Sequence, residues 1–172
     1  AENIPVYTWA ATDGLHMGVG FLVDRLTALM MCVVTFVSLM VHIYTIGYMH
    51  EDPGYQRFFS YISLFTFSML MLVMSNNFLQ LFLGWEAVGL VSYLLIVFWF
   101  KRESAIFANL KAFLVNRVGD FGFILGIDGV VTFTGSLDYA DVFERADCVG
   151  TKHIEIFSGT PWTEMSATCL LP

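Results

Sequence analysis

Apolar residues fall into long runs that are separated by short polar stretches. His42 is the one potentially charged side chain of residues 26–49, residues 58–75 carry no charge, and Glu86 is the one charged residue of 78–100. A bilayer core about 30 Å thick needs roughly 20 apolar residues to be spanned by a helix. The three runs therefore predict three transmembrane helices, with a turn at Asn76 and Asn77 between the second and the third.

A fourth run, residues 105–134, contains Lys111, Arg117, Asp120 and Asp128 among apolar residues and glycines. This run is too charged to face lipid, but it suits a helix buried by its neighbours. The pattern predicts an all-α membrane protein, a polytopic transmembrane helix bundle of four spanning helices over residues 21–135. Residues 1–20 are expected to be an extramembrane N-terminal segment, and residues 136–172 a polar extramembrane loop. That loop leads to a truncated next helix, which begins in the apolar run 167–171.

Composition excludes the other broad classes of protein. The chain is 57% hydrophobic and 13% charged, whereas a soluble domain carries about 25% charged residues and a disordered chain is poor in apolar ones. The net charge of −7 argues against nucleic acid and anionic lipid as partners. The three cysteines lack metal-ligand or redox spacing, and no phosphate-binding loop or nucleophile motif is present. We expect no cofactor and no metal to be bound by this chain.

Basic residues in the loops predict the orientation in the membrane. Arg57 lies between the first two runs, and Lys101 and Arg102 lie between the last two, whereas the turn at residues 76–77 has no basic residue. Because short cytoplasmic loops are enriched in lysine and arginine, these two basic loops are expected on the cytoplasmic side. The remaining acidic tail is then on the opposite side; its six acidic residues are Asp138, Asp141, Glu144, Asp147, Glu155 and Glu164.

Charged side chains inside the predicted spans indicate where the chemistry lies. Each costs roughly 2.5–3.5 kcal/mol at the bilayer centre, and such residues usually mark ion or proton pathways. Arg117 and Asp120 are three residues apart on one helix and can satisfy each other. Glu86 has no basic residue at i±3 or i±4, so it must pair with another helix, hold a proton or contact water. Its pattern fits either proton handling or a static interhelical ion pair.

Depth along the helices selects a partner for Glu86. At about 1.5 Å per residue from the expected cytoplasmic ends, Glu86 lies about 21 Å deep, Arg117 about 18 Å and Asp120 about 22 Å. Lys111 lies only about 9 Å deep on that scale. Arg117 is therefore the better local partner, and moving this cation toward or away from Glu86 would unload and load a proton. Lys111 either takes part in proton movement or extends to the membrane interface.

Two further features allow a functional or a structural interpretation. His42 can relay protons because histidine titrates near neutral pH, but it can equally be a hydrogen-bonded structural residue. Helical projection places Gly119, Gly122, Gly126 and Gly129 on one stripe with Lys111, and Arg117, Asp120 and Asp128 on the opposite side. We interpret the glycines as a packing face, so that both sides of this helix are expected to be buried.

Two motifs in this order resemble the largest antiporter-like membrane subunit of respiratory complex I, the proton-pumping NADH:quinone oxidoreductase. The first motif is LGWEAVGLVSYLLI at residues 83–96, and the second is KAFLVNRVGD at residues 111–120. The resemblance takes in residues 18–140, with DRLT at 24–27, HIY at 42–44, GYQRFF at 54–59 and GSL at 135–137. It favours the bacterial type over the organellar ones.

The resemblance implies a role for each matching residue. Glu86 matches the essential membrane-embedded glutamate of a proton channel, and Lys111, Arg117 and Asp120 match as well. Asp128 departs from the apolar residues of the family, and residues 141–172 resemble it poorly, so no role is transferred to either.

As a member of this family, the chain would be a subunit of the H⁺-translocating oxidoreductase without redox catalysis of its own. NADH, FMN, iron–sulfur clusters and quinone are then expected in partner subunits of a bacterial cytoplasmic membrane complex. The main alternative is the large subunit of a multisubunit cation/proton antiporter, which shares the Gly-Trp-Glu motif. A second alternative is a membrane scaffold that transports nothing.

Overall fold

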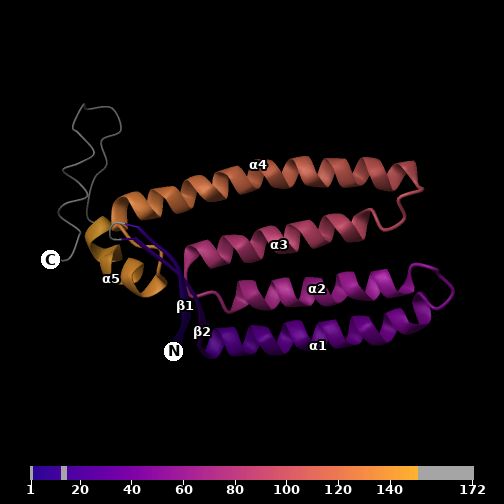
Figure 1. Cartoon of the computed structure of the whole chain (residues 1–172), viewed down its shortest axis with the longest axis horizontal. Coiled ribbons are helices and arrows are strands. Elements are labelled where there is room, and N and C mark those ends of the chain that lie inside the picture. Colours follow the sequence, from indigo (N-terminus) through magenta and orange to yellow (C-terminus); the bar gives the residue numbers. More distant parts are fainter. Residues whose placement is uncertain (1, 13–14, 151–172) are drawn as a thin grey trace.

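The computed structural model describes residues 2–12 and 15–150, and Figure 1 shows a row of four long helices with smaller elements gathered at one end. A hairpin of β1 (Glu2–Thr12) and β2 (Leu15–Val23) precedes α1 (Arg25–Tyr48), α2 (Tyr55–Val73), α3 (Phe78–Ile96) and α4 (Glu103–Thr134). A short helix, α5 (Tyr139–Gly150), follows. Consecutive long helices are neighbours in space, so the topology is up-and-down.

Three of the described helices, α1, α2 and α3, are long and apolar enough to cross a membrane. This confirms the predicted polytopic transmembrane architecture. α4 is long enough to cross a membrane, since its 32 residues would extend about 48 Å, but its charged residues make it too polar to count as such a helix by composition. The crossing of α4 stays a prediction, and it is supported by the position of this helix beside α3.

Polar residues set the helix ends. Asp24 begins α1 by accepting a hydrogen bond from the Thr27 N–H at 2.6 Å, an N-cap that also lowers the pKa of this carboxyl. Asn77 caps α3 in the same way, accepting from the Gln80 N–H at 2.7 Å. Gly135 ends α4 in the left-handed region with φ 70°, which glycine adopts without strain.

The observed bounds differ modestly from those expected from the apolar runs. α2 begins three residues before the predicted start at 58, because its first turn is polar and was not part of the apolar run. α3 ends at Ile96 rather than at 100, where the chain turns toward α4. The predicted truncated helix at 167–171 lies outside the described residues.

The N-terminal segment is a β-hairpin, which the all-helical prediction did not include. Its strands pair antiparallel from Glu2↔Val23 to Thr12↔Leu15 with two bulges, so the predicted boundary at residue 20 falls inside β2. Asn77 Nδ2 donates to Gly18 O at 2.9 Å, and Gln80 Oε1 accepts from Gly20 N–H at 3.2 Å. Buried polar groups of the α2–α3 turn therefore hold the hairpin against the helix ends.

α5 docks on the same turn. The Tyr139 N–H donates to Asn76 O at 3.2 Å, and the Tyr139 ring meets Phe78 edge-to-face at 4.8 Å between centroids. Burial raises the pKa of the Tyr139 phenol, an effect opposed by its hydrogen bond with Ser75. The hairpin, the turn and α5 thus form one cap at this end of the helices (Figure 1).

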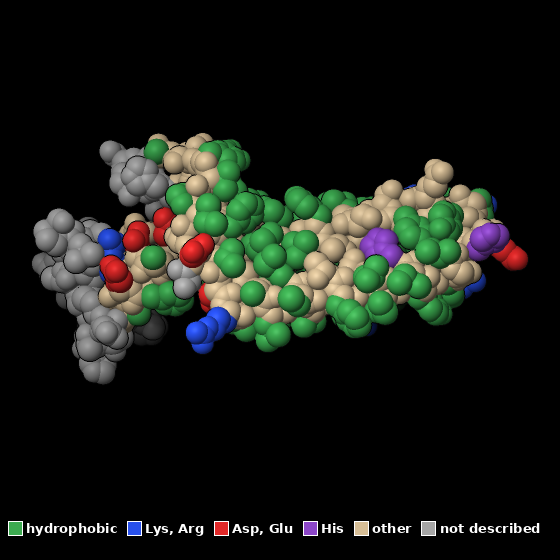
Figure 2. Space-filling view, turned by 90° about the horizontal axis from the view of Figure 1, so that it is seen from below, with side chains coloured by type: hydrophobic (Ala, Val, Ile, Leu, Met, Phe, Trp, Pro, Cys, Tyr) green, Lys and Arg blue, Asp and Glu red, His purple; other side chains and the backbone are tan. Residues whose placement is uncertain are grey.

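Side-chain types are distributed as a membrane-spanning body requires. Figure 2 shows hydrophobic side chains over the length of the helices and charged ones gathered toward the two ends. Most large apolar side chains on α1 and α4 are exposed. An apolar outer surface suits a hydrocarbon surrounding, in which lipid rather than water contacts these side chains.

The glycines of α4 do not form a buried face in the described structure. A Cβ built at Gly119, Gly122, Gly126 or Gly129 would meet nothing within 4 Å. The expectation that both sides of this helix are buried is therefore wrong for the described chain, since α3 covers one side alone. A close approach occurs instead at Gly84, where a Cβ would lie 2.8 Å from the Leu72 backbone of α2.

Candidate functional site: a charge cluster between α3 and α4

Glu86 and Arg117 form a bidentate ion pair across the α3–α4 interface. Arg117 Nη2 donates to Glu86 Oε2 at 2.7 Å, and Arg117 Nη1 donates to Glu86 Oε1 at 3.1 Å. The planar guanidinium matches the carboxylate with two parallel hydrogen bonds, the strongest form of this pair. The proximity predicted from helix depth is confirmed by this contact.

Asp120 shares the same guanidinium. Its Oδ2 lies 3.2 Å from Arg117 Nη2, an ion pair that lacks the alignment of a hydrogen bond. The Asp120 side chain is only 8% exposed, compared with 24% for Glu86 and 43% for Arg117. The predicted pairing of Arg117 with Asp120 is thus confirmed, but Glu86 makes the stronger contact with Arg117.

Trp85 holds the other oxygen of Asp120. Its indole Nε1–H donates to Asp120 Oδ1 at 3.0 Å. A tryptophan of a membrane-spanning helix suits either an interface or a packing position. Trp85 occupies a packing position, because it is the eighth residue of α3 and contacts Asp120 and Phe123 of α4. A signal was available, since Trp85 precedes Glu86 directly in the same motif.

The cluster carries an unbalanced charge. Two carboxylates share one guanidinium, so the ionised trio has a net charge of −1. In a site of low dielectric constant, such a group gains from binding a proton or a further cation. In the observed arrangement one guanidinium contacts both carboxylates, and Glu86 accepts both of its hydrogen bonds.

A small cavity adjoins the cluster. It has a volume of about 170 Å³ and lies between α3 and α4, where Ser92, Tyr93, Asn116 and Arg117 contribute polar groups to its wall. Space of this size is sufficient for water, and these four residues offer the two to four polar partners that a water molecule needs. Arg117 thus lies between the two carboxylates and a mainly apolar cavity that has a few polar groups in its wall.

Lys111 is exposed on α4, six residues before Arg117, or about 9 Å along the helix axis. Asp128 is exposed eight residues beyond Asp120. The described helices bring neither of them into the cluster, whose ion pairs join Arg117 to Glu86 and Asp120.

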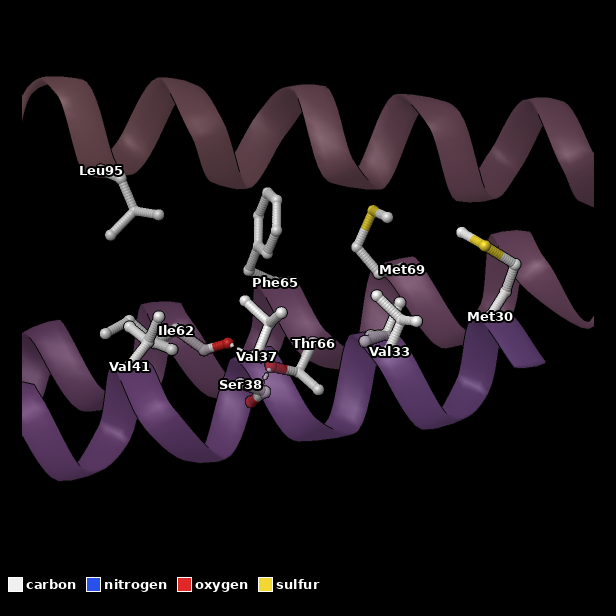
Figure 3. Close-up of a pocket in the computed structure, with 11 residues that line it drawn as sticks. Met30, Val33, Val37, Ser38, Val41, Ile62, Phe65, Thr66, Met69 and Leu95 are labelled. Atoms are coloured by element: carbon white, nitrogen blue, oxygen red, sulfur yellow. Dashed lines mark hydrogen bonds between the residues drawn. The ribbon is translucent and has the colours of Figure 1, made fainter. Parts of the chain in front are cut away.

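His42 lies in a different polar group, on α1 against α2. Its Nδ1 is 2.7 Å from Ser38 O, and its Nε2 is 3.4 Å from Ser63 Oγ. Ser38 Oγ in turn lies 2.7 Å from Thr66 Oγ1, in the wall of an otherwise apolar cavity of about 440 Å³ (Figure 3). These contacts favour the structural interpretation of His42, which hydrogen-bonds α1 to α2 and takes no part in the α3–α4 ion pairs.

Metal binding finds no support in the part of the chain that the structure describes, where no group of three or more His, Cys, Asp or Glu could hold an ion. The roles of Glu86, Lys111, Arg117, Asp120 and His42 in transport stay predictions. What the geometry adds is that three of these five residues meet at one point.

Comparison with known families identifies the chain. The profile described as "NADH-Ubiquinone oxidoreductase (complex I), chain 5 N-terminus" matches residues 9–59. The profile described as "NADH:quinone oxidoreductase/Mrp antiporter, TM" matches residues 75–165, more than half of the chain. The matches extend beyond the resemblance at residues 18–140, so the view that residues 141–172 fit the family poorly is corrected as far as residue 165.

Curated relatives give the same result. Subunit L of the NADH-quinone oxidoreductase of Neisseria meningitidis serogroup B is 69% identical over 168 residues, which is 96% of this chain and 25% of the relative. Subunit L of Rickettsia felis is 49% identical over 88% of this chain and 24% of the relative. Chain 5 of the NADH-ubiquinone oxidoreductase of Arabidopsis thaliana is 50% identical over 95% of this chain and 24% of the relative. The chain spans about a quarter of the length of these relatives, and it belongs to the family of antiporter-like membrane subunits of NADH:quinone oxidoreductase, complex I.

Proposed function

We propose that this chain is the part of a complex I membrane subunit that moves protons through charged residues of its membrane helices. The observation that carries the proposal is the position of Arg117 between two carboxylates, at 2.7 Å from Glu86 and 3.2 Å from Asp120. Glu86 and Lys111 act as the proton-carrying groups, with Arg117, Asp120 and His42 as the supporting charge network. Family membership supplies the context.

The chemistry follows from the sharing of one cation. When Arg117 pairs with Glu86, that carboxylate is held ionised, because the guanidinium stabilises its charged form. When Arg117 turns toward Asp120, Glu86 loses its counter-ion in a poorly solvated place and takes up a proton. Return of Arg117 to Glu86 releases the proton. The cycle needs only a rotamer change of one arginine, because both acceptors already lie within 3.2 Å of the same nitrogen.

Proton entry is proposed from the α3–α4 cavity that Ser92, Tyr93 and Asn116 help to line. Lys111 lies on the side of Arg117 toward the start of α4, so its ammonium would act between the membrane surface and this cavity. His42 supports this network only structurally, by hydrogen-bonding α1 to α2 at a distance from the carboxylates.

The driving reaction belongs to other subunits. The relatives are named as subunits of NADH-quinone and NADH-ubiquinone oxidoreductases. By analogy, NADH, FMN, iron–sulfur clusters and quinone would be bound by partner subunits, and this chain would contact other membrane subunits and the bilayer. The proposed location is a bacterial cytoplasmic membrane, since the relative with 69% identity is bacterial.

The test is NADH-driven proton uptake by inside-out vesicles that carry the assembled complex with Glu86→Gln. We expect proton uptake per NADH oxidised to fall while assembly is preserved, because a neutral amide can neither hold the proton nor pair with Arg117. Glu103→Gln is the matched control, since Glu103 is an exposed carboxylate in the first turn of α4. Unchanged proton uptake in Glu86→Gln at equal assembly would contradict the proposal.

One alternative retains a specific observation in its favour. The matching family profile names the Mrp antiporter together with the oxidoreductase, so a cation/proton antiporter subunit is the second candidate. Sodium-dependent proton exchange without NADH-linked uptake would select it. A scaffold role would be selected if charge-neutral substitutions at Glu86, Arg117 and Asp120 all left proton uptake unchanged.

A further inference from the structure

The guanidinium of Arg117 has a contact besides the two carboxylates. Its Cζ atom lies over the face of the Phe113 ring, 5.2 Å from the ring centroid. A guanidinium within about 6 Å of a ring centroid is attracted by the negative face of the aromatic ring. Phe113 precedes Arg117 by four residues on α4, so the two side chains are neighbours on one side of the helix. Arg117 therefore makes a cation–π contact within its own helix.

The Phe113 ring is itself held by α3. It packs at a tilt against the ring of Tyr93, with 5.6 Å between the two centroids. Both rings line the cavity of about 170 Å³ that adjoins the cluster. Because Phe113 contacts both α3 and the guanidinium, its position is fixed with respect to the interface in which the Glu86 ion pair forms.

Phe113 and Asp120 lie on opposite sides of Arg117 along the axis of α4. Phe113 lies one turn toward the start of the helix, and Asp120 lies three residues toward its end. Helical side chains lean toward the N-terminus of their helix, so the Arg117 side chain extends toward the ring. The two hydrogen bonds to Glu86 coexist with this ring contact. Movement of the guanidinium into alignment with Asp120 would carry it toward the end of α4 and away from the ring.

We propose that Phe113 is a positioning residue, whose ring face holds the Arg117 guanidinium against Glu86. This inference rests on the proposed function, in which Arg117 controls the ionisation of Glu86. When the ring contact is weakened, Arg117 leaves Glu86 more often, and the carboxylate is then protonated more often. Phe113 thus sets how firmly the cation is held on the carboxylate that carries the proton.

The test changes the electrons of the ring and leaves its shape nearly the same. Phenylalanine analogues with one, two or three ring fluorines are placed at position 113 of the assembled complex, because fluorine weakens the negative charge of the ring face. Dicyclohexylcarbodiimide is the probe, since it modifies protonated carboxyl groups in apolar surroundings. Peptide mass spectrometry should show faster labelling of Glu86 with each added fluorine. The increase should reach about two- to fivefold with three fluorines, as expected for a cation–π contact of a ring that is 42% exposed.

Phe121 provides the matched control. It follows Arg117 by four residues on α4 and is 66% exposed. Among the described residues, the ring beneath the Arg117 guanidinium is that of Phe113, so fluorines at position 121 should leave the labelling of Glu86 unchanged. Phe113→Leu should increase labelling as three fluorines do. Phe113→Tyr keeps an aromatic face and should label like the unaltered complex.

The outcomes separate this role from simple packing. Labelling of Glu86 that stays the same along the fluorine series, including no labelling in any member, would overturn the role of Phe113. An equal increase with fluorines at position 121 would overturn it as well. Because labelling needs no NADH, it is independent of the proton-uptake test. A graded increase in labelling, together with unchanged proton uptake in Glu86→Gln, would support the positioning by Phe113 and reject the proposed function.

Discussion

Arg117 is a single cation between two carboxylates whose surroundings differ. Asp120 is nearly buried and is held by the Trp85 indole, whereas Glu86 is partly exposed and held by Arg117 alone among the described side chains. A carboxylate that already accepts a hydrogen bond from a second donor is stabilised less by pairing with the guanidinium. Arg117 can therefore rest on Glu86, as observed, and the strength of the Trp85 hydrogen bond sets how readily it turns toward Asp120.

Trp85→Phe tests this balance. The phenyl ring can keep the contact with Phe123, but the donor to Asp120 Oδ1 is lost. A hydrogen bond to a charged group contributes about 1.5–3 kcal/mol. The equilibrium between Arg117 paired with Glu86 and Arg117 paired with Asp120 should therefore shift by about tenfold or more. We expect proton uptake per NADH in inside-out vesicles to fall, with the complex still assembled.

Trp99→Phe is the matched control for that experiment. Trp99 also donates its indole N–H to an aspartate, Asp52 at 3.3 Å, but at the far end of α3. Its replacement should leave proton uptake unchanged. Equal uptake in the two variants would show that the Trp85 hydrogen bond has no influence on the cluster.

Sequence could predict the partners of Glu86 but not the full cluster. Helix depth follows from counting residues, which is why Arg117 and Asp120 were placed level with Glu86. The contact of Trp85 with α4 depends on how α3 is rotated against α4, and residue counting contains no information on that rotation. The same limit applies to Lys111, whose exposure could not be derived from its depth.

Among the helices, the contact of α2 with α3 depends on a glycine. A Cβ at Gly84 would lie 2.8 Å from the Leu72 backbone, which cannot move aside as a flexible side chain can. At Gly89, five residues further along, a Cβ would lie 3.8 Å from Asn116 Nδ2, an ordinary contact. The α2–α3 contact therefore leaves no room for a side chain at Gly84, whereas a methyl group fits at Gly89.

Gly84→Ala should therefore lower the thermal stability of the complex, by about 1–3 kcal/mol for such overpacking. Gly89→Ala should be neutral or slightly stabilising, since alanine favours a helix by up to about 1 kcal/mol over glycine. Thermal unfolding of the purified complexes, followed by intrinsic fluorescence, measures both changes. A loss in Gly89→Ala equal to that in Gly84→Ala would refute the close-approach argument.

The docking of α5 should weaken in alkali because of Tyr139. Burial raises the pKa of this phenol, so the folded state keeps a proton that the undocked state loses. The resulting stabilisation is fully present below the ordinary tyrosine pKa and is lost as the pH rises through the raised value. Limited proteolysis of α5 across that range should show faster cleavage at high pH.

Tyr139→Phe serves as the control for this pH dependence. It keeps the ring against Phe78 and has no proton to lose, so cleavage of α5 should no longer accelerate through that range of pH. An unchanged pH profile in Tyr139→Phe would assign the effect to another group.

Of the elements, sequence predicted the helices well and the cap poorly. Long apolar runs define α1, α2 and α3, because a bilayer imposes both length and composition on a spanning helix. The hairpin was missed, although Asp-Gly at positions 13–14 between two alternating segments is a strong hairpin signal. Its attachment depends on side chains of Asn77 and Gln80, which are distant in sequence and could not be assigned to it beforehand.

On the scale of the whole molecule, the charge cluster lies at the surface of the described helices. Arg117 is 43% exposed in the middle of α4, and an ionised group that faces lipid there costs roughly 2.5–3.5 kcal/mol. The open glycine side of α4 leaves room for close helix packing as well. We infer that further protein covers α4, which agrees with relatives about four times as long as this chain.

The two ends of the helices also differ in their basic residues, and this difference predicts which end is cytoplasmic. Arg57, Lys101 and Arg102 lie at the end opposite the hairpin. At the hairpin end, the described basic residues are Arg25 at the start of α1 and Arg145 in α5. Because positive residues in short loops stay on the cytoplasmic side, the hairpin and α5 should lie outside the cytoplasm. The measurement is labelling by a membrane-impermeant maleimide in a background without Cys32, Cys148 and Cys169. His50→Cys should react only in inside-out vesicles, and Ala146→Cys only in right-side-out ones, with detergent exposing both as the control. The reverse pattern would place the cavity beside Arg117 in contact with the opposite compartment, and proton uptake would then have to enter from the hairpin end.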